Sequence, residues 1–133
     1  MKSLLVVAHG SRRAQSNDEV RQLTACLAGS TDGMFDRVSC AFLELAEPSI
    51  PDGLRADISA GASEVVVLPY FLSAGRHVVS DIPAEVDAVR REHPAVTITL
   101  APYLGAASGL VELLLAQAQD CPQTANTGSE SAS

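Results

Sequence analysis

The hydrophobic positions of the chain form short continuous runs that alternate with stretches of helical spacing. Apolar runs over residues 3–8, 37–43, 64–69 and 95–104 predict four strands. The runs over residues 3–8 and 64–69 are expected to be buried, and the many Val, Leu, Ile and Ala residues suit a parallel sheet buried on both faces. Apolar side chains three and four positions apart predict a helix after each strand. This order, strand then helix four times over, predicts an α/β fold: a four-stranded parallel sheet with right-handed crossovers and helices on both faces.

Each predicted helix has an apolar stripe that we expect to face the sheet. The last helix is expected over residues 107–119, and Ser80 is expected to cap the third helix at its start. Residues 1–119 are expected to form one domain, and the small polar residues 120–133 a disordered tail. In chain order, the stripes are Val20, Leu23, Thr24 and Leu27; Ile50, Leu54 and Ile58; Ile82, Val86 and Val89; and Leu110, Leu113 and Leu114.

Composition and charge exclude several classes of partner. The formal net charge is −7 and Lys2 is the only lysine, so we expect neither nucleic acid nor an anionic membrane as a partner, since both need a spread of positive charge. No apolar run approaches the roughly 18 residues of a membrane span, and no signal peptide precedes the first strand, which predicts a cytoplasmic protein. The three cysteines have no paired spacing and predict neither a disulfide framework nor a zinc site.

Polar residues gather directly after the predicted strands, where parallel sheets bind their ligands. Two imidazoles with a carboxylate are a ligand set that Co²⁺, Ni²⁺, Fe²⁺ or Zn²⁺ accepts. The arginines beside them can hold a carboxylate or phosphate, and a glycine near each histidine permits unusual backbone angles. After the first three strands stand His9, Gly10, Ser11, Arg12 and Arg13; Glu44 and Glu47; and Tyr70, Phe71, Leu72, Gly75, Arg76 and His77.

Each of these residues also has a purely structural interpretation. His9 and His77 can be hydrogen-bonded loop histidines, and Glu47 can compensate the dipole of the helix that follows it. Arg12 and Arg13 together can form a solvated helix start. Glu44 is harder to explain structurally, because it ends an apolar strand. The joint pattern therefore favours a functional site more strongly than any single residue does.

Three motifs together resemble the CbiX/SirB-type class II sirohydrochlorin chelatases. The motifs are AHGSR at residues 8–12, FLELAEPSI at residues 42–50 and LPYFLSAGRHVVSDIP at residues 68–83. The third motif is long and specific, whereas the first alone is weak. The resemblance extends over residues 4–114, nearly the whole predicted domain.

This resemblance implies a chelatase-like fold and a lyase that inserts a divalent metal into sirohydrochlorin or a related tetrapyrrole, in cobalamin or sirohaem biosynthesis. It implies that His9 and His77 bind the incoming metal and accept pyrrole protons, and the position of Glu44 adds a catalytic carboxylate. The metal, whether cobalt, iron or nickel, is then a substrate, with no permanently bound cofactor. Short relatives pair as homodimers, so a homodimer is expected here. The expected substrate contacts are Ser11, Arg12, Arg13, Phe71, Leu72, Gly75 and Arg76.

Three other functions fit parts of the pattern. A non-catalytic carrier of metal or tetrapyrrole would keep the same ligands. A histidine phosphatase would use His9 as phosphoryl acceptor, but that family has an arginine where Ala8 stands here. One half of a hetero-oligomer is a further alternative, which the presence of both histidines in one chain disfavours.

Overall fold

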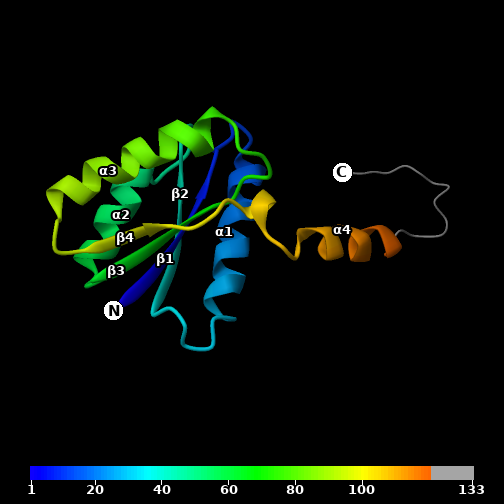
Figure 1. The fold of residues 1–133 in the computed structure, drawn as a ribbon, viewed down its shortest axis with the longest axis horizontal. Coiled ribbons are helices and arrows are strands. Elements are labelled where there is room, and N and C mark those ends of the chain that lie inside the picture. Colours follow the sequence, from blue (N-terminus) through cyan, green and yellow to red (C-terminus); the bar gives the residue numbers. More distant parts are fainter. Residues whose placement is uncertain (121–133) are drawn as a thin grey trace.

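The computed structural model describes residues 1–120 and contains one four-stranded sheet (Figure 1). All strands are parallel and lie in the order β2-β1-β3-β4, which confirms the predicted sheet. Strand β2 is added on one side of β1, and β3 and then β4 are added on the other side, so the strand order reverses between β1 and β3. Ligands of such sheets bind at this reversal, beyond the carboxyl ends of the strands. The strands are β1 Lys2–Ala8, β2 Arg37–Phe42, β3 Glu64–Pro69 and β4 Thr97–Leu100.

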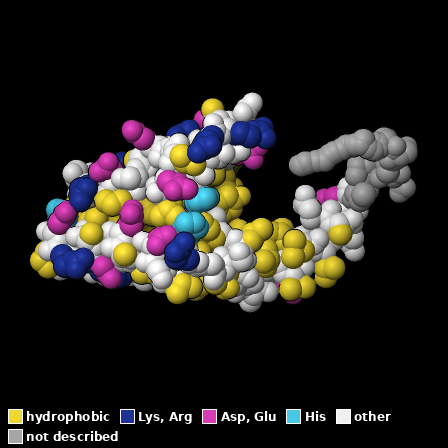
Figure 2. All heavy atoms as spheres, turned by 90° about the horizontal axis from the view of Figure 1, so that it is seen from above, with side chains coloured by type: hydrophobic (Ala, Val, Ile, Leu, Met, Phe, Trp, Pro, Cys, Tyr) yellow, Lys and Arg dark blue, Asp and Glu magenta, His cyan; other side chains and the backbone are white. Residues whose placement is uncertain are grey.

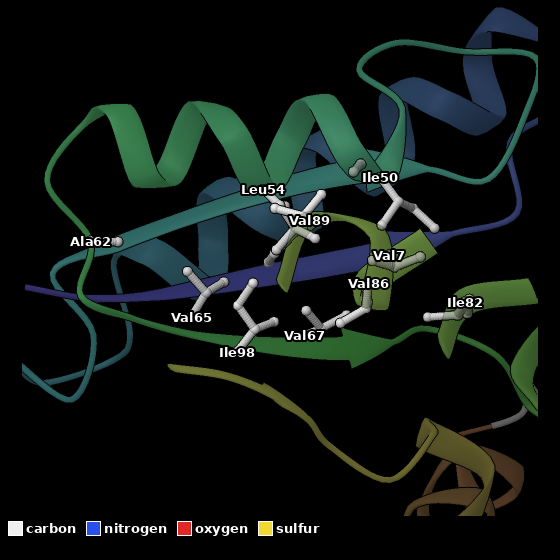
Figure 3. Close-up of a cluster of buried hydrophobic side chains, with 12 residues drawn as sticks. Val7, Ile50, Leu54, Ala62, Val65, Val67, Ile82, Val86, Val89 and Ile98 are labelled. Atoms are coloured by element: carbon white, nitrogen blue, oxygen red, sulfur yellow. The ribbon is translucent and has the colours of Figure 1, made fainter. Parts of the chain in front are cut away.

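Three helices cover the two faces of the sheet. Helix α1, Ala14–Ala28, lies on one face, and helices α2, Ile50–Ser59, and α3, Ile82–Glu92, lie side by side on the other (Figure 1). The main core is packed between the sheet and the α2–α3 pair (Figure 3). Its buried side chains are Leu5, Val7, Ala41, Ile50, Leu54, Ala62, Val65, Val67, Ile82, Val86, Val89 and Ile98.

The strand register brings the loops after β1, β2 and β3 to the same edge. The amide of Leu43 donates to the carbonyl oxygen of Ala8 at 2.9 Å, which extends the β1–β2 ladder by one step. The amide of Tyr70 donates to the carbonyl oxygen of Val7 at 2.7 Å. The loops that follow these three strands therefore start side by side at one edge of the sheet.

The start of the third helix differs from the prediction. Ser80 is not a cap, because the chain is already helical from His77 through a π-helical turn, η1, His77–Asp81, that continues into α3. The carbonyl oxygen of Gly75 accepts from the amides of Val78 and Val79, at 3.1 and 3.0 Å, and so begins the helix upstream of Ser80.

The last helix also differs from the prediction. Helix α4, Leu110–Gln119, follows a short 3-10 turn, η2, Leu104–Ala106, and projects away from the sheet (Figure 1). The expected inward position of Leu113 and Leu114 is wrong, since both are 60% exposed. The turn carries the chain off the sheet after β4, so α4 packs on neither face of the sheet. Strand β3 likewise buries only alternate residues, and not both faces as predicted.

Two further expectations concern the ends and the surface of the chain. Residues 121–133 lie outside the described residues, so the disordered tail stays a prediction. Among the residues that are described, no helix has the length and apolar character to cross a bilayer.

Candidate active site

Two imidazoles lie side by side at the carboxyl edge of the sheet. His9 directly follows β1, and His77 opens the π-helical turn that comes after β3, so the two flank the reversal of strand order. Their ring centroids are 4.8 Å apart and their planes are inclined by 32°. Both side chains are about half exposed, and Figure 2 shows two neighbouring histidines with acidic side chains beside them. The predicted meeting of His9 and His77 is thus present in the fold.

Glu44 is the carboxylate next to His9. Its Oε2 lies 3.1 Å from His9 Nε2, and its backbone amide donates to the His9 carbonyl oxygen at 3.0 Å. Gly10 makes this close approach possible, because a Cβ at that position would lie 1.7 Å from the Glu44 carbonyl oxygen. Its φ of +94° is also a region that favours glycine. Glycine at position 10 therefore allows the loops after β1 and β2 to be in direct backbone contact.

Asp81 is a second carboxylate in the site, which the sequence analysis did not assign to it. Its Oδ2 lies 2.7 Å from His77 Nδ1, one helical turn away. The signal was present in the spacing, since residues four apart on a helix share a face. A carboxylate at Nδ1 fixes the orientation of the ring and leaves Nε2 available as a ligand atom.

Acidic side chains surround a pocket that His77 lines. A pocket of about 290 Å³ is lined by Leu43, Glu44, His77, Asp81, Ala84 and Glu85. Burial, and then the negative charge of Asp81, raise the pKa of the Glu85 carboxyl above its ordinary value. Three carboxylates around one opening attract divalent cations.

Apolar side chains form the wall beside the imidazoles. The Phe71 ring centroid lies 6.4 Å from that of His9, and a pocket of about 200 Å³ is lined by Tyr70, Phe71, Leu72 and Leu104. Leu72 is largely exposed. Such a wall suits a flat, largely apolar ligand face. Another pocket, of about 430 Å³, borders Glu44 but neither imidazole.

The loop after His9 is held internally by Asn17, a buried residue that the sequence analysis did not single out. The Asn17 side chain accepts from the Ser11 amide at 2.9 Å and donates to the Ser11 carbonyl oxygen at 2.8 Å. The Ser11 hydroxyl oxygen accepts from the Arg13 amide at 3.0 Å. These two backbone amides are therefore already engaged within the loop, and the guanidinium groups of Arg12 and Arg13 are its charged anion donors.

The arginines of the site are exposed. Arg12 and Arg13 lie between β1 and α1, and Arg76 directly precedes His77. Within the part of the chain that the structure describes, none of the three forms an ion pair with an acidic side chain. Gly75 is also exposed, with no atom within 4 Å of a Cβ built on it.

The CbiX family matches residues 3–121 of the chain. The chain belongs to the CbiX family. It is 33% identical to the chloroplastic sirohydrochlorin ferrochelatase of Arabidopsis thaliana over 89% of its own length and 52% of the relative's. It is 30% identical to the sirohydrochlorin cobaltochelatase of Priestia megaterium over 98% of its own length and 42% of the relative's. This CbiX chain thus spans about half the length of these two curated relatives.

Solved structures share the fold of this CbiX chain. A crystal structure described as a cobalamin-biosynthesis CbiX protein from Marinobacter aquaeolei superposes with a TM-score of 0.74 at 30% identity, over 90% of this chain and 96% of that one. SirB from Bacillus subtilis subspecies spizizenii in complex with cobalt superposes with a TM-score of 0.73 at 27% identity, over 90% of this chain and 50% of that one. The chelatase-like α/β fold is confirmed.

The nitrogen donors of this site are the two imidazoles of His9 and His77. Among residues 1–120, no three histidine, cysteine or acidic side chains are placed to hold one ion together. The imidazole pair offers two nitrogen ligands, which leaves most positions of a divalent metal open to other donors.

Proposed function

We propose that this chain inserts a divalent metal ion, cobalt or iron, into sirohydrochlorin as a cytoplasmic lyase of cobalamin or sirohaem biosynthesis. The metal is a substrate, and the proposal includes no permanently bound cofactor. The observation that carries it is the pair of imidazoles 4.8 Å apart, each with its own carboxylate. The names of the relatives support the substrate, since both ferrochelatase and cobaltochelatase occur among them.

In this proposal His9 and His77 hold the incoming ion. The Asp81 carboxylate accepts from Nδ1–H of His77, which leaves the Nε2 lone pair for the metal. His9 has its Nε2 against Glu44, so its Nδ1 is the free ligand atom. Both rings are neutral when they bind metal, because a protonated imidazole has no lone pair.

The same imidazoles then take up protons. Insertion breaks two pyrrole N–H bonds and forms metal–nitrogen bonds in their place, so two protons must leave the macrocycle. Each imidazole regains a lone pair when it releases the ion, and histidine accepts a proton near neutral pH. Glu44 and Asp81 stabilise the imidazolium ions that result. His9, His77 and Glu44 are accordingly the proposed catalytic residues.

The surrounding residues are proposed to hold the tetrapyrrole. Phe71 and Leu72 form the apolar wall, and the exposed guanidinium groups of Arg12, Arg13 and Arg76 are free to bind its peripheral carboxylates. The net charge of −7 opposes a polyanionic substrate, but charges beyond about 10 Å are largely screened at 0.1 M salt. The nearby arginines therefore decide local binding.

Ser11 and Gly75 shape this substrate surface in the proposal. Ser11 orders the arginine loop through the hydrogen bonds that it makes with Asn17 and Arg13. The bare backbone at Gly75 leaves room for the ligand next to Arg76.

Catalytic turnover distinguishes this function from a carrier with the same ligands. Sirohydrochlorin and Co²⁺, Fe²⁺ or Ni²⁺ are mixed without oxygen in fiftyfold excess over the protein, and the absorbance change is compared with spontaneous insertion. The proposal predicts many insertions per protein molecule with cobalt or iron. A burst that ends at one equivalent would identify a carrier, and a rate equal to the spontaneous rate would refute insertion.

A homodimer is part of the proposal. It is supported by the lengths of the relatives, since this chain matches about half of SirB but nearly all of the Marinobacter CbiX protein. Two copies of the unit would then do what one longer chain does in SirB.

A further inference from the structure

Leu45 has a backbone conformation that leucine rarely adopts. Its φ is +66°, in the left-handed region, where the Cβ of an L-residue lies too close to the following carbonyl oxygen. Its side chain is also 55% exposed, so it contributes only part of what a fully buried leucine contributes to stability. Glycine or asparagine suits this backbone better. Neither local conformational preference nor burial therefore explains a leucine at this position.

The loop between β2 and α2, which carries Leu45, is held on both sides of this residue. Before it, the Glu44 amide donates to the His9 carbonyl oxygen at 3.0 Å. After it, Nη2 of Arg21 on α1 donates to the Glu47 carbonyl oxygen at 3.0 Å. A strained residue persists where its surroundings fix the backbone in this way, and such residues cluster at functional sites. The strain at Leu45 therefore indicates a role in the site that adjoins it.

The strand order places Leu45 and Leu72 on opposite sides of His9. His9 follows β1, Leu45 follows β2 and Leu72 follows β3, and the sheet order is β2-β1-β3-β4 (Figure 1). The two outer strands of this trio are two strand spacings apart, about 10 Å. Leu72 is 70% exposed, so an exposed leucine lies on each flank of the imidazole.

Free space lies next to Leu45. The pocket of about 430 Å³ is lined by residues of this loop and of the start of α2, among them Glu44 and Leu45. It adjoins the proposed metal ligands, since Glu44 Oε2 lies 3.1 Å from His9 Nε2. A flat macrocycle whose central nitrogens lie over the imidazoles extends beyond them on all sides. Such a ligand needs support on both flanks of the site.

We propose that Leu45 is a substrate contact, which supports one edge of the tetrapyrrole while Phe71 and Leu72 support the opposite edge. The inference rests on the proposed function and adds a residue that the sequence analysis did not assign to the site. Binding of the ring removes the exposed apolar surface of Leu45 from water, which stabilises the complex and not the free protein. The fixed loop holds the leucine in place beforehand, so less conformational entropy is lost on binding.

Sirohydrochlorin binding without metal tests this contact separately from insertion. The Kd is measured by absorbance titration for wild type, Leu45→Ala, Leu45→Gly and Leu45→Met. Loss of the apolar side chain in the alanine and glycine variants should weaken binding about tenfold, whereas methionine, which is apolar and of similar volume, should keep the Kd within about twofold. The matched control is Met34→Ala, which removes an exposed apolar side chain before β2, at the opposite edge of the sheet, and should bind like wild type.

Thermal unfolding tests the strain independently of any ligand. Alanine and glycine both remove the leucine side chain, but only glycine suits a φ of +66°, so Leu45→Gly should melt at a higher temperature than Leu45→Ala. Met34 lies outside the left-handed region, so the order should be reversed there, with Met34→Gly melting below Met34→Ala. A Leu45→Gly protein that melts no higher than Leu45→Ala would overturn the strain argument.

The binding data have clear alternative outcomes. Unchanged sirohydrochlorin binding by Leu45→Ala would overturn the contact, as would an equal loss in Met34→Ala or a wild type that does not bind sirohydrochlorin. Binding that is weakened at Leu45 but followed by no metal insertion in wild type would instead refute the proposed function and leave the contact standing.

Discussion

The close approach of the loops after β1 and β2 makes Gly10→Ala the most informative single substitution. Gly10 has a φ of +94°, and the new methyl group would lie 1.7 Å from the carbonyl oxygen of Glu44. Cβ contacts shorter than 3.0 Å essentially do not occur, so one backbone must move by more than 1 Å. The movement pulls His9 away from Glu44 and lengthens the 3.0 Å hydrogen bond between the two backbones.

The expected loss of stability has three parts. An alanine in the left-handed region costs about 1–2 kcal/mol. Overpacking costs about 1–3 kcal/mol, and a lost hydrogen bond about 1 kcal/mol. The lower entropy of the unfolded alanine chain returns about 0.4–1 kcal/mol. The free energy of unfolding should therefore fall by about 2–5 kcal/mol, which lowers the melting temperature by roughly 8–20 °C in a domain of this size.

Three glycines of the same chain serve as controls for Gly10→Ala in thermal unfolding. Gly33→Ala has the positive φ, +81°, without any neighbour, whereas Gly105→Ala has the clash without the positive φ. Gly75→Ala has neither feature. The loss of stability should be largest for Gly10→Ala, intermediate for Gly105→Ala and Gly33→Ala, and near zero for Gly75→Ala.

Metal insertion by the Gly10→Ala protein provides the functional readout. A displacement of about 1 Å in a catalytic group can cost about a hundredfold in rate, so a folded Gly10→Ala protein should insert metal far more slowly than Gly33→Ala. A Gly10→Ala protein as stable and as active as Gly33→Ala would refute the argument that backbone contact at Glu44 sets the site.

Three further substitutions test individual contacts. Asp81→Asn should lower kcat for insertion about 10–100-fold and leave KM for the tetrapyrrole unchanged, because it removes the carboxylate that orients His77. An unchanged kcat would contradict this orienting role. Burial and the charge of Asp81 raise the pKa of Glu85 above its ordinary 4.5, so ionisation of Glu85 destabilises the fold as the pH rises above that value. In urea titrations, Glu85→Gln should slightly stabilise the protein at pH 7 and not at pH 4. Equal effects at both pH values would contradict this raised pKa. Ser49→Ala should lower the free energy of unfolding by about 1 kcal/mol, because the Ser49 hydroxyl oxygen accepts from the Asp52 amide at the start of α2; an unchanged urea midpoint would count against this cap.

The sheet and its ligand edge could be predicted because they depend on local pattern. Each strand is a short apolar run, and parallel strands connected by helices must end at one edge. His9, Glu44 and His77 follow three of these strands, so their convergence needed no knowledge of side-chain detail. Gly10 beside His9 was also predictable as a point of unusual backbone geometry, although its contact with Glu44 was not.

The start of α3 could not be predicted from the capping preferences of single residues. Ser80 is a good capping residue by type, but the Gly75 carbonyl oxygen starts the helix earlier. That early start is what places Asp81 one turn after His77, so the second carboxylate of the site was missed for the same reason.

Helix α4 shows a different limit. Its apolar spacing predicted an inward face, but periodicity does not say which surface, if any, buries a given side chain. The prediction assumed this chain's own sheet, whereas contacts between Gly105 and Leu72 direct the helix away from it. Contacts between residues distant in sequence decide this placement, and the sequence pattern does not contain them.

The central claim is that His9 and His77 perform metal insertion, and the most direct test is the insertion rate of single histidine variants. His9→Ala, His77→Ala and the control His93→Ala, which removes the third histidine at the end of α3, are compared with wild type using sirohydrochlorin and Co²⁺ or Fe²⁺ without oxygen. We expect the first two to fall to the spontaneous rate and the third to match wild type. Wild-type rates in folded His9→Ala and His77→Ala proteins would contradict the claim.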